Sequence, residues 1–229
     1  FYIDSEGKYR ILLTDLVTPT DTFDLKVSGN VSVDYVVDPT VRYWVGGGSS
    51  SNWSATGNTN WSATSGGANN ASVPDSATDV IFDTGSAPSV IDSSFTVGSI
   101  TISGYTGTIT QNANLSITNS GGLSGSYVQS SNATFTATNP DTNTFSATGS
   151  FTLTSGVFRR YTGIGISSDP FLIFDVYGLQ AMKTATTSSF NLNNNINAAT
   201  TTGCNSGAGV DPVGNVTTPY IGIFDGNNF

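Results

Sequence analysis

The stretch that decides the fold is FTVGSITISGYTGTITQNANLSITNSGGLSGSYVQ, residues 95–129. Its apolar residues alternate with Ser and Thr over short distances, and Gly, Asn or Ser interrupt each run. The apolar positions are Phe95, Val97, Ile100, Ile102, Ile109, Leu115, Ile117 and Leu123. This pattern predicts very short strands, of about three to five residues, joined by tight turns.

Two architectures accommodate such strands. One is a β-sandwich with alternating faces, and the other is a β-solenoid in which successive coils stack in register. The step from Ile100–Ile102 to Leu115–Ile117 to Phe135 is about 15–20 residues, which suits a coil. We therefore expect an all-β protein, either a short-stranded β-solenoid (β-helix) or a β-sandwich stack, with an N-terminal β-hairpin and one short helix.

The composition restricts the partners of the chain. Of 229 residues, 10% are charged and the formal net charge is −9. Nucleic acids and anionic membrane surfaces both require clusters of Lys and Arg, so neither is an expected partner. No apolar run approaches the ~18 residues of a membrane span. Aromatic residues make up 11% of the chain and are spread along it, which argues against disorder.

Three regions follow from the changes in pattern along the chain. Residues 1–41 carry an alternating hairpin pattern, with strands at 23–27 and 31–35 around a turn at 28–30. Residues 42–165 form a Trp-capped region of short strands. Residues 166–229 change character again and are expected to begin a parallel β-helix, which the end of the sequence truncates.

The tryptophans form a conspicuous group. NWSATGN (52–58) and NWSATSG (60–66) form an imperfect tandem repeat that places Trp53 and Trp61 eight residues apart, shortly after Trp44. These three rings are candidates for stacking on a glycan. The alternative, which we favour, is that they cap one end of the β-stack and shield its core.

Residues with catalytic chemistry are scarce. The chain has no histidine, which excludes histidine-based triads and HExxH zinc sites. The single cysteine, Cys204, is expected to fill space in the interior. The carboxylates that could pair for catalysis or Ca²⁺ binding sit beside Gly, Pro or Ser, where turns explain them better; they are Asp75, Asp79, Asp83, Asp169 and Asp175. We expect no enzyme activity, no cofactor and no metal site. Arg159 and Arg160 are expected to lie on a solvated edge.

The last region carries four ordered motifs. YGLQAM (177–182) lies in a helix expected over 176–183, and FNLNNNI (190–196) is a strand whose asparagines predict amide bonds along the stack. DPVG (211–214) and YIGIFDGNNF (220–229) follow. Together they resemble secreted bacterial and archaeal surface proteins with GLUG-type parallel β-helix repeats, akin to filamentous-haemagglutinin-like adhesins. Residues 42–83 also resemble modules of bacterial and phage surface proteins. Both resemblances imply an extracellular or cell-surface location, with the virion surface as the alternative.

The end of the sequence predicts an open strand edge. Ile221, Ile223, Phe224 and Phe229 would line it, and a parallel coil leaves backbone groups unpaired at its last rung. The chain either continues beyond this piece or pairs with another subunit. In the second case the donor strand would come from the N-terminal segment with Tyr9, Ile11, Leu12 and Leu13, which gives a head-to-tail polymer.

These inferences favour a structural function. We expect a subunit of a surface filament, sheath or stalk that assembles with copies of itself through β-strand pairing. The first alternative is a glycan-binding adhesin or phage-fibre module that uses Trp44, Trp53 and Trp61. A β-helix carbohydrate-active enzyme is a weaker alternative, because histidine is missing and cations are few.

Overall fold

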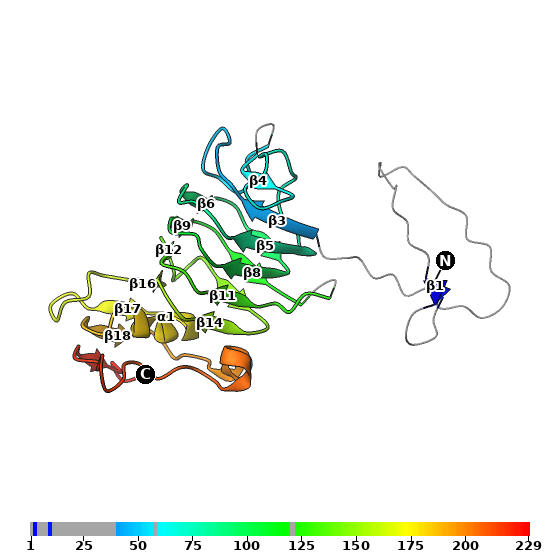
Figure 1. The fold of residues 1–229 in the computed structure, drawn as a ribbon. Coiled ribbons are helices and arrows are strands. Elements are labelled where there is room, and N and C mark those ends of the chain that lie inside the picture. Colours follow the sequence, from blue (N-terminus) through cyan, green and yellow to red (C-terminus); the bar gives the residue numbers. More distant parts are fainter. Residues whose placement is uncertain (1, 4–8, 11–39, 57–58, 120–121) are drawn as a thin grey trace. The chain divides into compact units, whose positions relative to one another are not determined.

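The computed structural model describes residues 2–3, 9–10, 40–56, 59–119 and 122–229, and the chain forms two units, Phe1–Tyr35 and Val36–Phe229 (Figure 1). In the first unit, β1 (Tyr2–Ile3) and β2 (Tyr9–Arg10) form an antiparallel pair with Ile3 opposite Tyr9. The hairpin predicted over 23–35 lies outside the described residues.

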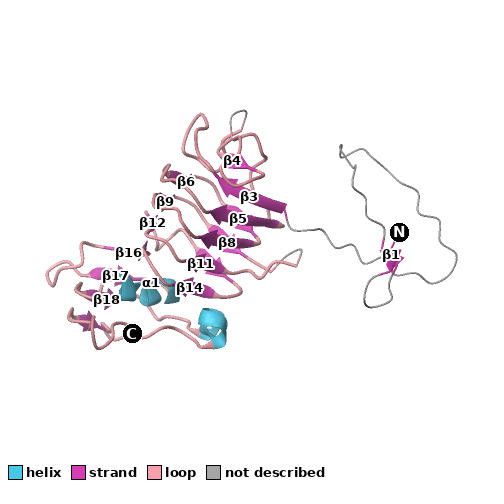
Figure 2. Ribbon diagram, viewed as in Figure 1, coloured by secondary structure: helices cyan, strands magenta, loops and turns pink. Residues whose placement is uncertain are grey.

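The second unit is a β-solenoid in which each full coil gives one strand to each of three parallel sheets, two of which can be followed in Figure 2. The first coil is β5 (Thr78–Phe82), β6 (Ser89–Ile91) and β7 (Phe95–Val97). The second is β8 (Ser99–Ile102), β9 (Thr108–Gln111) and β10 (Leu115–Ile117). The third is β11 (Tyr127–Gln129), β12 (Thr134–Ala137) and β13 (Phe145–Ala147), and β14 (Phe151–Leu153) with β15 (Val157–Arg159) begins a fourth. The solenoid, one of the two predicted architectures, is therefore the fold.

The register shows where the expected coil length was wrong. Val80, Ile100, Tyr127 and Phe151 are successive partners in one sheet, so the rungs are 20, 27 and 24 residues apart. The segment Leu115–Ile117, which had suggested a shorter step, belongs to a different sheet of the same coil as Ile100. Because the corners between strands vary in length, the chain has no constant repeat.

The core changes along the stack from aliphatic to aromatic. The first two coils are filled mainly by Val, Ile and Leu, whereas the third and fourth contribute stacked rings. Tyr127 stacks on Phe151 with centroids 5.4 Å apart, and Phe135 stacks on Phe158 at 4.6 Å. In-register partners thus place like side chains on one another, which is the packing that holds a solenoid together.

The amino-terminal end of the stack is closed by an irregular cap. β3 (Thr40–Trp44) runs parallel to β5, and β4 (Trp61–Ser62) pairs antiparallel with β3, which completes a six-stranded sheet. The carboxyl-terminal part forms a second, smaller arrangement. There β16 (Tyr161–Thr162) pairs antiparallel with β17 (Phe171–Ile173), and β18 (Phe190–Leu192) and β19 (Phe224–Asp225) extend that sheet in parallel.

The helix predicted over 176–183 is confirmed. α1 covers Val176–Ala181 and continues as a 3₁₀ turn, η1, at Met182–Thr184. A second 3₁₀ helix, η2, spans Ala199–Gly207 and was not predicted, because its Thr, Gly and Asn residues have poor helix propensity. Its buried Cys204 fills interior space, as expected.

Within the 190–196 motif, Asn194 bonds along the stack, but to a backbone acceptor, and Asn227, outside the motif, does the same. The Asn194 side-chain amide donates to the Phe174 carbonyl (3.0 Å), and that of Asn227 donates to the Leu192 carbonyl (3.3 Å). Each amide therefore joins its own rung to the preceding one.

Candidate functional site

The three tryptophans lie inside the cap. Trp44 is 1% exposed, and Trp53 and Trp61 are fully buried. The Trp61 ring packs edge-to-face on both other rings, with centroids 5.1 Å apart in each case. Each indole N–H donates within the protein, to the Ala87 carbonyl, the Ser89 hydroxyl and the Trp53 carbonyl respectively. A sugar needs an exposed ring face, which these positions do not offer. They instead shield the first coil, which is the alternative that the sequence favoured.

The asparagines of the tandem repeat make different contacts in its two copies. The side chain of Asn60, 1% exposed, donates to the carbonyls of Ser50 and Asn52 and accepts from the Gly48 N–H. The first copy of the repeat lies against the first coil, where Asn52 forms an isolated parallel β-bridge with Val90. Asn60 of the second copy therefore holds the backbone at the start of the first copy, whereas Asn52 of the first copy pairs with the first coil.

Side chains close the far end of the coil stack, where a next rung would otherwise pair. The Tyr177 hydroxyl accepts from the Ala147 N–H (2.9 Å) and donates to the Ala147 carbonyl (3.2 Å), at the edge of β13. Lys183 donates to the Leu153 carbonyl at the edge of β14 (2.8 Å), and the Thr184 hydroxyl accepts from the N–H of Phe158 in β15 (3.5 Å). The residues of α1 and η1 thus replace backbone partners on all three sheets.

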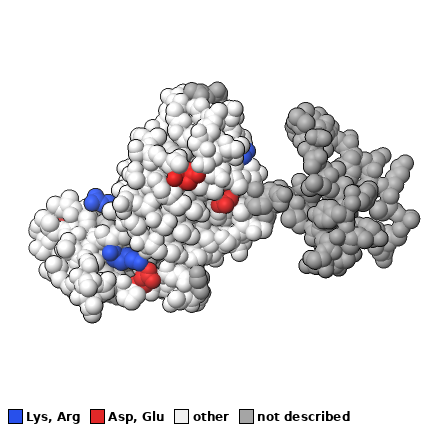
Figure 3. All heavy atoms as spheres, viewed as in Figure 1, with Lys and Arg blue, Asp and Glu red and all other residues white. Residues whose placement is uncertain are grey.

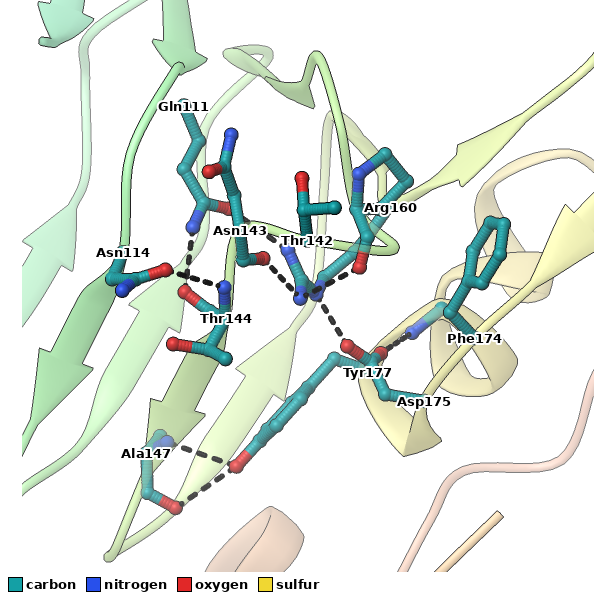
Figure 4. Close-up of polar contacts among 12 residues, drawn as sticks. Gln111, Asn114, Thr142, Asn143, Thr144, Ala147, Arg160, Phe174, Asp175 and Tyr177 are labelled. Carbon is teal, nitrogen blue, oxygen red and sulfur yellow. Dashed lines mark hydrogen bonds and ion pairs between the residues drawn. The ribbon is translucent and has the colours of Figure 1, made fainter. Parts of the chain in front are cut away.

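A buried arginine holds this end together (Figure 4). Arg160, 2% exposed, forms an ion pair with Asp175 through Nε (2.5 Å) and donates to Gln111 Oε1 (3.0 Å). Its Nη2 donates to the carbonyls of Asn143 (2.7 Å) and Pro140 (3.3 Å). The guanidinium also lies over the Phe145 ring, 5.8 Å from its centroid. The expectation that Arg160 is solvated was wrong, whereas Arg159 is exposed.

The alternation of side chains along the strand is the sequence signal that could have predicted the burial of Arg160. In β15, Phe158 points inward and Arg159 outward, so a period of two turns the next residue inward again. Asp175 then supplies two functions from two oxygens. Oδ1 accepts from the Gly178 N–H and caps α1, while Oδ2 binds Arg160.

Next to this cluster lies a surface hollow of about 510 Å³. Its buried lining residues are Pro140, Phe145 and Arg160, and Phe174 and Asp175 are half-buried. Exposed polar residues complete the lining; they are Asp141, Thr144, Asn193 and Asn194. The hollow combines apolar surface with hydrogen-bonding side chains that come from four separate parts of the chain.

Local bonds account for two of the other candidate carboxylates, Asp75 and Asp79, whereas Asp83 Oδ1 is buried without a hydrogen-bond partner among the described residues. Asp75 accepts from the Ala77 N–H (3.0 Å) in the predicted turn, and Asp79 accepts from the Ser99 hydroxyl. Burial raises the pKa of the Cys204 thiol. In the part of the chain that the structure describes, no three His, Cys, Asp or Glu residues gather as metal ligands.

The predicted carboxyl-terminal edge is exposed. The relative exposure is 70% for Ile221, 58% for Ile223, 45% for Phe224 and 52% for Phe229. Within the described residues, no strand pairs with the outer edge of β19. Of the predicted donor residues, Tyr9 lies in β2, and Ile11, Leu12 and Leu13 lie outside the described residues.

The surface itself is poor in charge. Figure 3 shows only scattered charged side chains on the face in view, separated by wide neutral areas. No helix within the described ranges has the length and hydrophobicity to cross a bilayer. No protein-family model, no curated protein and no solved structure matches the chain.

Proposed function

We propose that the protein is an extracellular structural element, the subunit of a surface filament, sheath or stalk that grows by strand addition to the outer edge of β19. One observation carries this proposal. That edge has no partner among the described residues and is bordered by exposed apolar side chains, including Ile223 and Phe224. By contrast, side chains close the three coil sheets at the same end of the stack.

The ladder of this sheet defines the strand that would extend it. Phe171, Phe190 and Phe224 are successive register partners, so each rung has a phenylalanine at the same place. The next position of the last rung is Asp225. A fitting strand therefore places an aromatic residue beside Phe224 and a cation beside Asp225.

A second copy of the chain offers this pattern in β2. Tyr9 is aromatic and Arg10 is cationic, and one side of β2 has no partner in the described part of the chain. In a parallel register, Tyr9 lies beside Phe224 and Arg10 beside Asp225. Aromatic and opposite-charge pairs across strands each contribute roughly 0.2–1 kcal/mol. The contact joins two different surfaces, so it does not close on itself and produces a linear polymer.

Two further features support the proposal. Residues 177–229, which resemble GLUG-type surface repeats, include the two rungs that end at this edge, β18 and β19. The fold also rests on short backbone ladders, with Ser and Thr on its surface, and this suits an extended structural element outside the cell. The resemblance implies the same location.

The test is a charge reversal with rescue in the 229-residue protein. Asp225→Arg and Arg10→Asp are made singly and together, and Asp169→Arg, at another exposed aspartate, is the matched control. Sedimentation velocity and electron microscopy measure assembly. We expect fibres from the native chain and the control, fewer from each single variant, and recovery in the double variant.

Two results would contradict the proposal at different levels. A native chain that remains monomeric at about 100 µM, far above the Kd of an ordinary specific interface, refutes assembly through this edge. Fibres that form equally well in both single variants refute the register with β2. In that case, fibre formation by Phe224→Lys decides whether the β19 edge takes part in assembly, because a cation at this position should weaken strand addition there.

A further inference from the structure

The hollow beside Arg160 contains hydrogen-bonding groups that the fold does not use. Within the described chain, the side chains of Asp141, Thr144 and Asn193 have no hydrogen-bond partner, although all three line the hollow. Arg160 has five N–H donors, and four acceptors are found for them. The hollow is therefore lined by free donors and free acceptors together, one of them on a side chain that is 2% exposed.

The charge of this lining excludes several ligand classes. Two carboxylates, Asp141 and Asp175, face one guanidinium that is already paired with Asp175. An anion would meet a surplus of negative charge. A metal ion would find only two acidic residues and no cysteine in the lining. An extended peptide would need a free backbone edge, but the carbonyls of Pro140 and Asn143 already accept from Arg160.

A neutral polyol meets these constraints. Sugar hydroxyls both donate and accept, so they can donate to Asp141 and accept from the amides and the guanidinium. The apolar faces of a sugar ring need an accessible partner as well, and the half-buried Phe174 supplies it. A volume of about 510 Å³ lies in the ~300–1,000 Å³ range of small-ligand sites.

We propose that this hollow, lined by Asp141, Phe174, Asp175, Asn193 and buried Arg160, binds a neutral carbohydrate. The site is separate from the tryptophans, which the sequence had offered for that purpose, and does not depend on assembly through β19. The Arg160–Asp175 pair fixes its inner wall, because both side chains are held by the fold before any ligand arrives.

The site is tested by NMR titration of the 229-residue protein with lactose, maltose, cellobiose and chitobiose, each to about 10 mM, which detects Kd values in the millimolar range. We expect at least one of these sugars to shift amide signals of residues 141–145, 174–175 and 193–194. Sodium sulfate at the same concentration is the anionic probe and is expected to shift none of them.

Three variants distinguish a built site from general surface effects. Phe174→Ala and Asp141→Asn should each weaken binding by about tenfold, the loss typical of one good contact. Asp169→Asn, which alters an exposed carboxylate outside the hollow, should leave the affinity unchanged. Thermal melts verify that each variant is folded. No shifts with any of the four sugars, shifts confined to other regions, or undiminished binding by both hollow variants would overturn the assignment.

Discussion

Replacing Arg160 is the most direct test of how the solenoid is closed at its carboxyl-terminal end. Arg160→Met keeps the length and the apolar stem of the side chain but removes the charge and all four hydrogen bonds. Removing a buried donor leaves each of its acceptors unsatisfied, at a cost of about 1–3 kcal/mol for each. Gln111 Oε1 and the Asn143 carbonyl are such acceptors, so we expect a total loss of about 3–5 kcal/mol.

The double-mutant cycle with Asp175 separates the ion pair from the rest. Asp175→Asn keeps an oxygen that can cap α1, since Asn and Asp are equally good caps, but loses the charge. The Asp175 side chain is 26% exposed and can be hydrated again when Arg160 is removed. We therefore expect a coupling energy of only about 1–2 kcal/mol between the two positions, and a cost of about 1–2 kcal/mol for Asp175→Asn alone.

The assay is urea unfolding followed by far-ultraviolet circular dichroism and by tryptophan fluorescence. All three tryptophans lie in the cap, at the opposite end of the stack from Arg160, so fluorescence reports whether the two ends unfold together. Arg159→Met, at the exposed neighbour, is the matched control and should change stability by less than about 0.5 kcal/mol. A loss below about 1 kcal/mol in Arg160→Met would refute the closing function of this residue.

Two further predictions concern a turn and the buried tyrosines. Gly156 has φ +78°, and a Cβ there would overlap the carbonyls of Ala133 and Ser131 and the Gln129 amide, whereas Gly122 (φ +83°) has open space. Gly122→Ala should cost about 1–2 kcal/mol for its backbone conformation alone, and Gly156→Ala clearly more; equal urea midpoints for the two variants would contradict the clash. Burial raises the pKa of Tyr105 and Tyr127, so the folded state keeps both protonated above pH ~10 while the unfolded chain ionises. Stability is then full below pH ~10 and falls above it by about 1.4 kcal/mol per pH unit for each such tyrosine. Urea midpoints across alkaline pH should show a shallower fall in Tyr127→Phe, and an unchanged slope would show that this tyrosine is not the cause.

The alternation of short apolar runs was sufficient to predict the class of fold, and the helical spacing of apolar residues over 176–183 was sufficient to predict α1. Ile100 and Ile102 turn inward because a strand has a period of two, and this holds wherever the strand lies. Ile223 and Phe224, which the motif over 220–229 placed at a strand edge, are exposed. These are local properties, and local patterns determine them.

The stacking partners and the polar cluster were decided only by the tertiary structure. Coil corners differ in length, so the sequence spacing does not reveal that Ile100 meets Tyr127 and that Leu115 lies on another sheet. The contact of Arg160 with Gln111 spans 49 residues, and its partner Asp175 resembled an ordinary turn residue. A hydrogen bond between distant segments depends on how the coils are superposed, and that superposition follows from the packing of the whole core rather than from any single stretch of the chain.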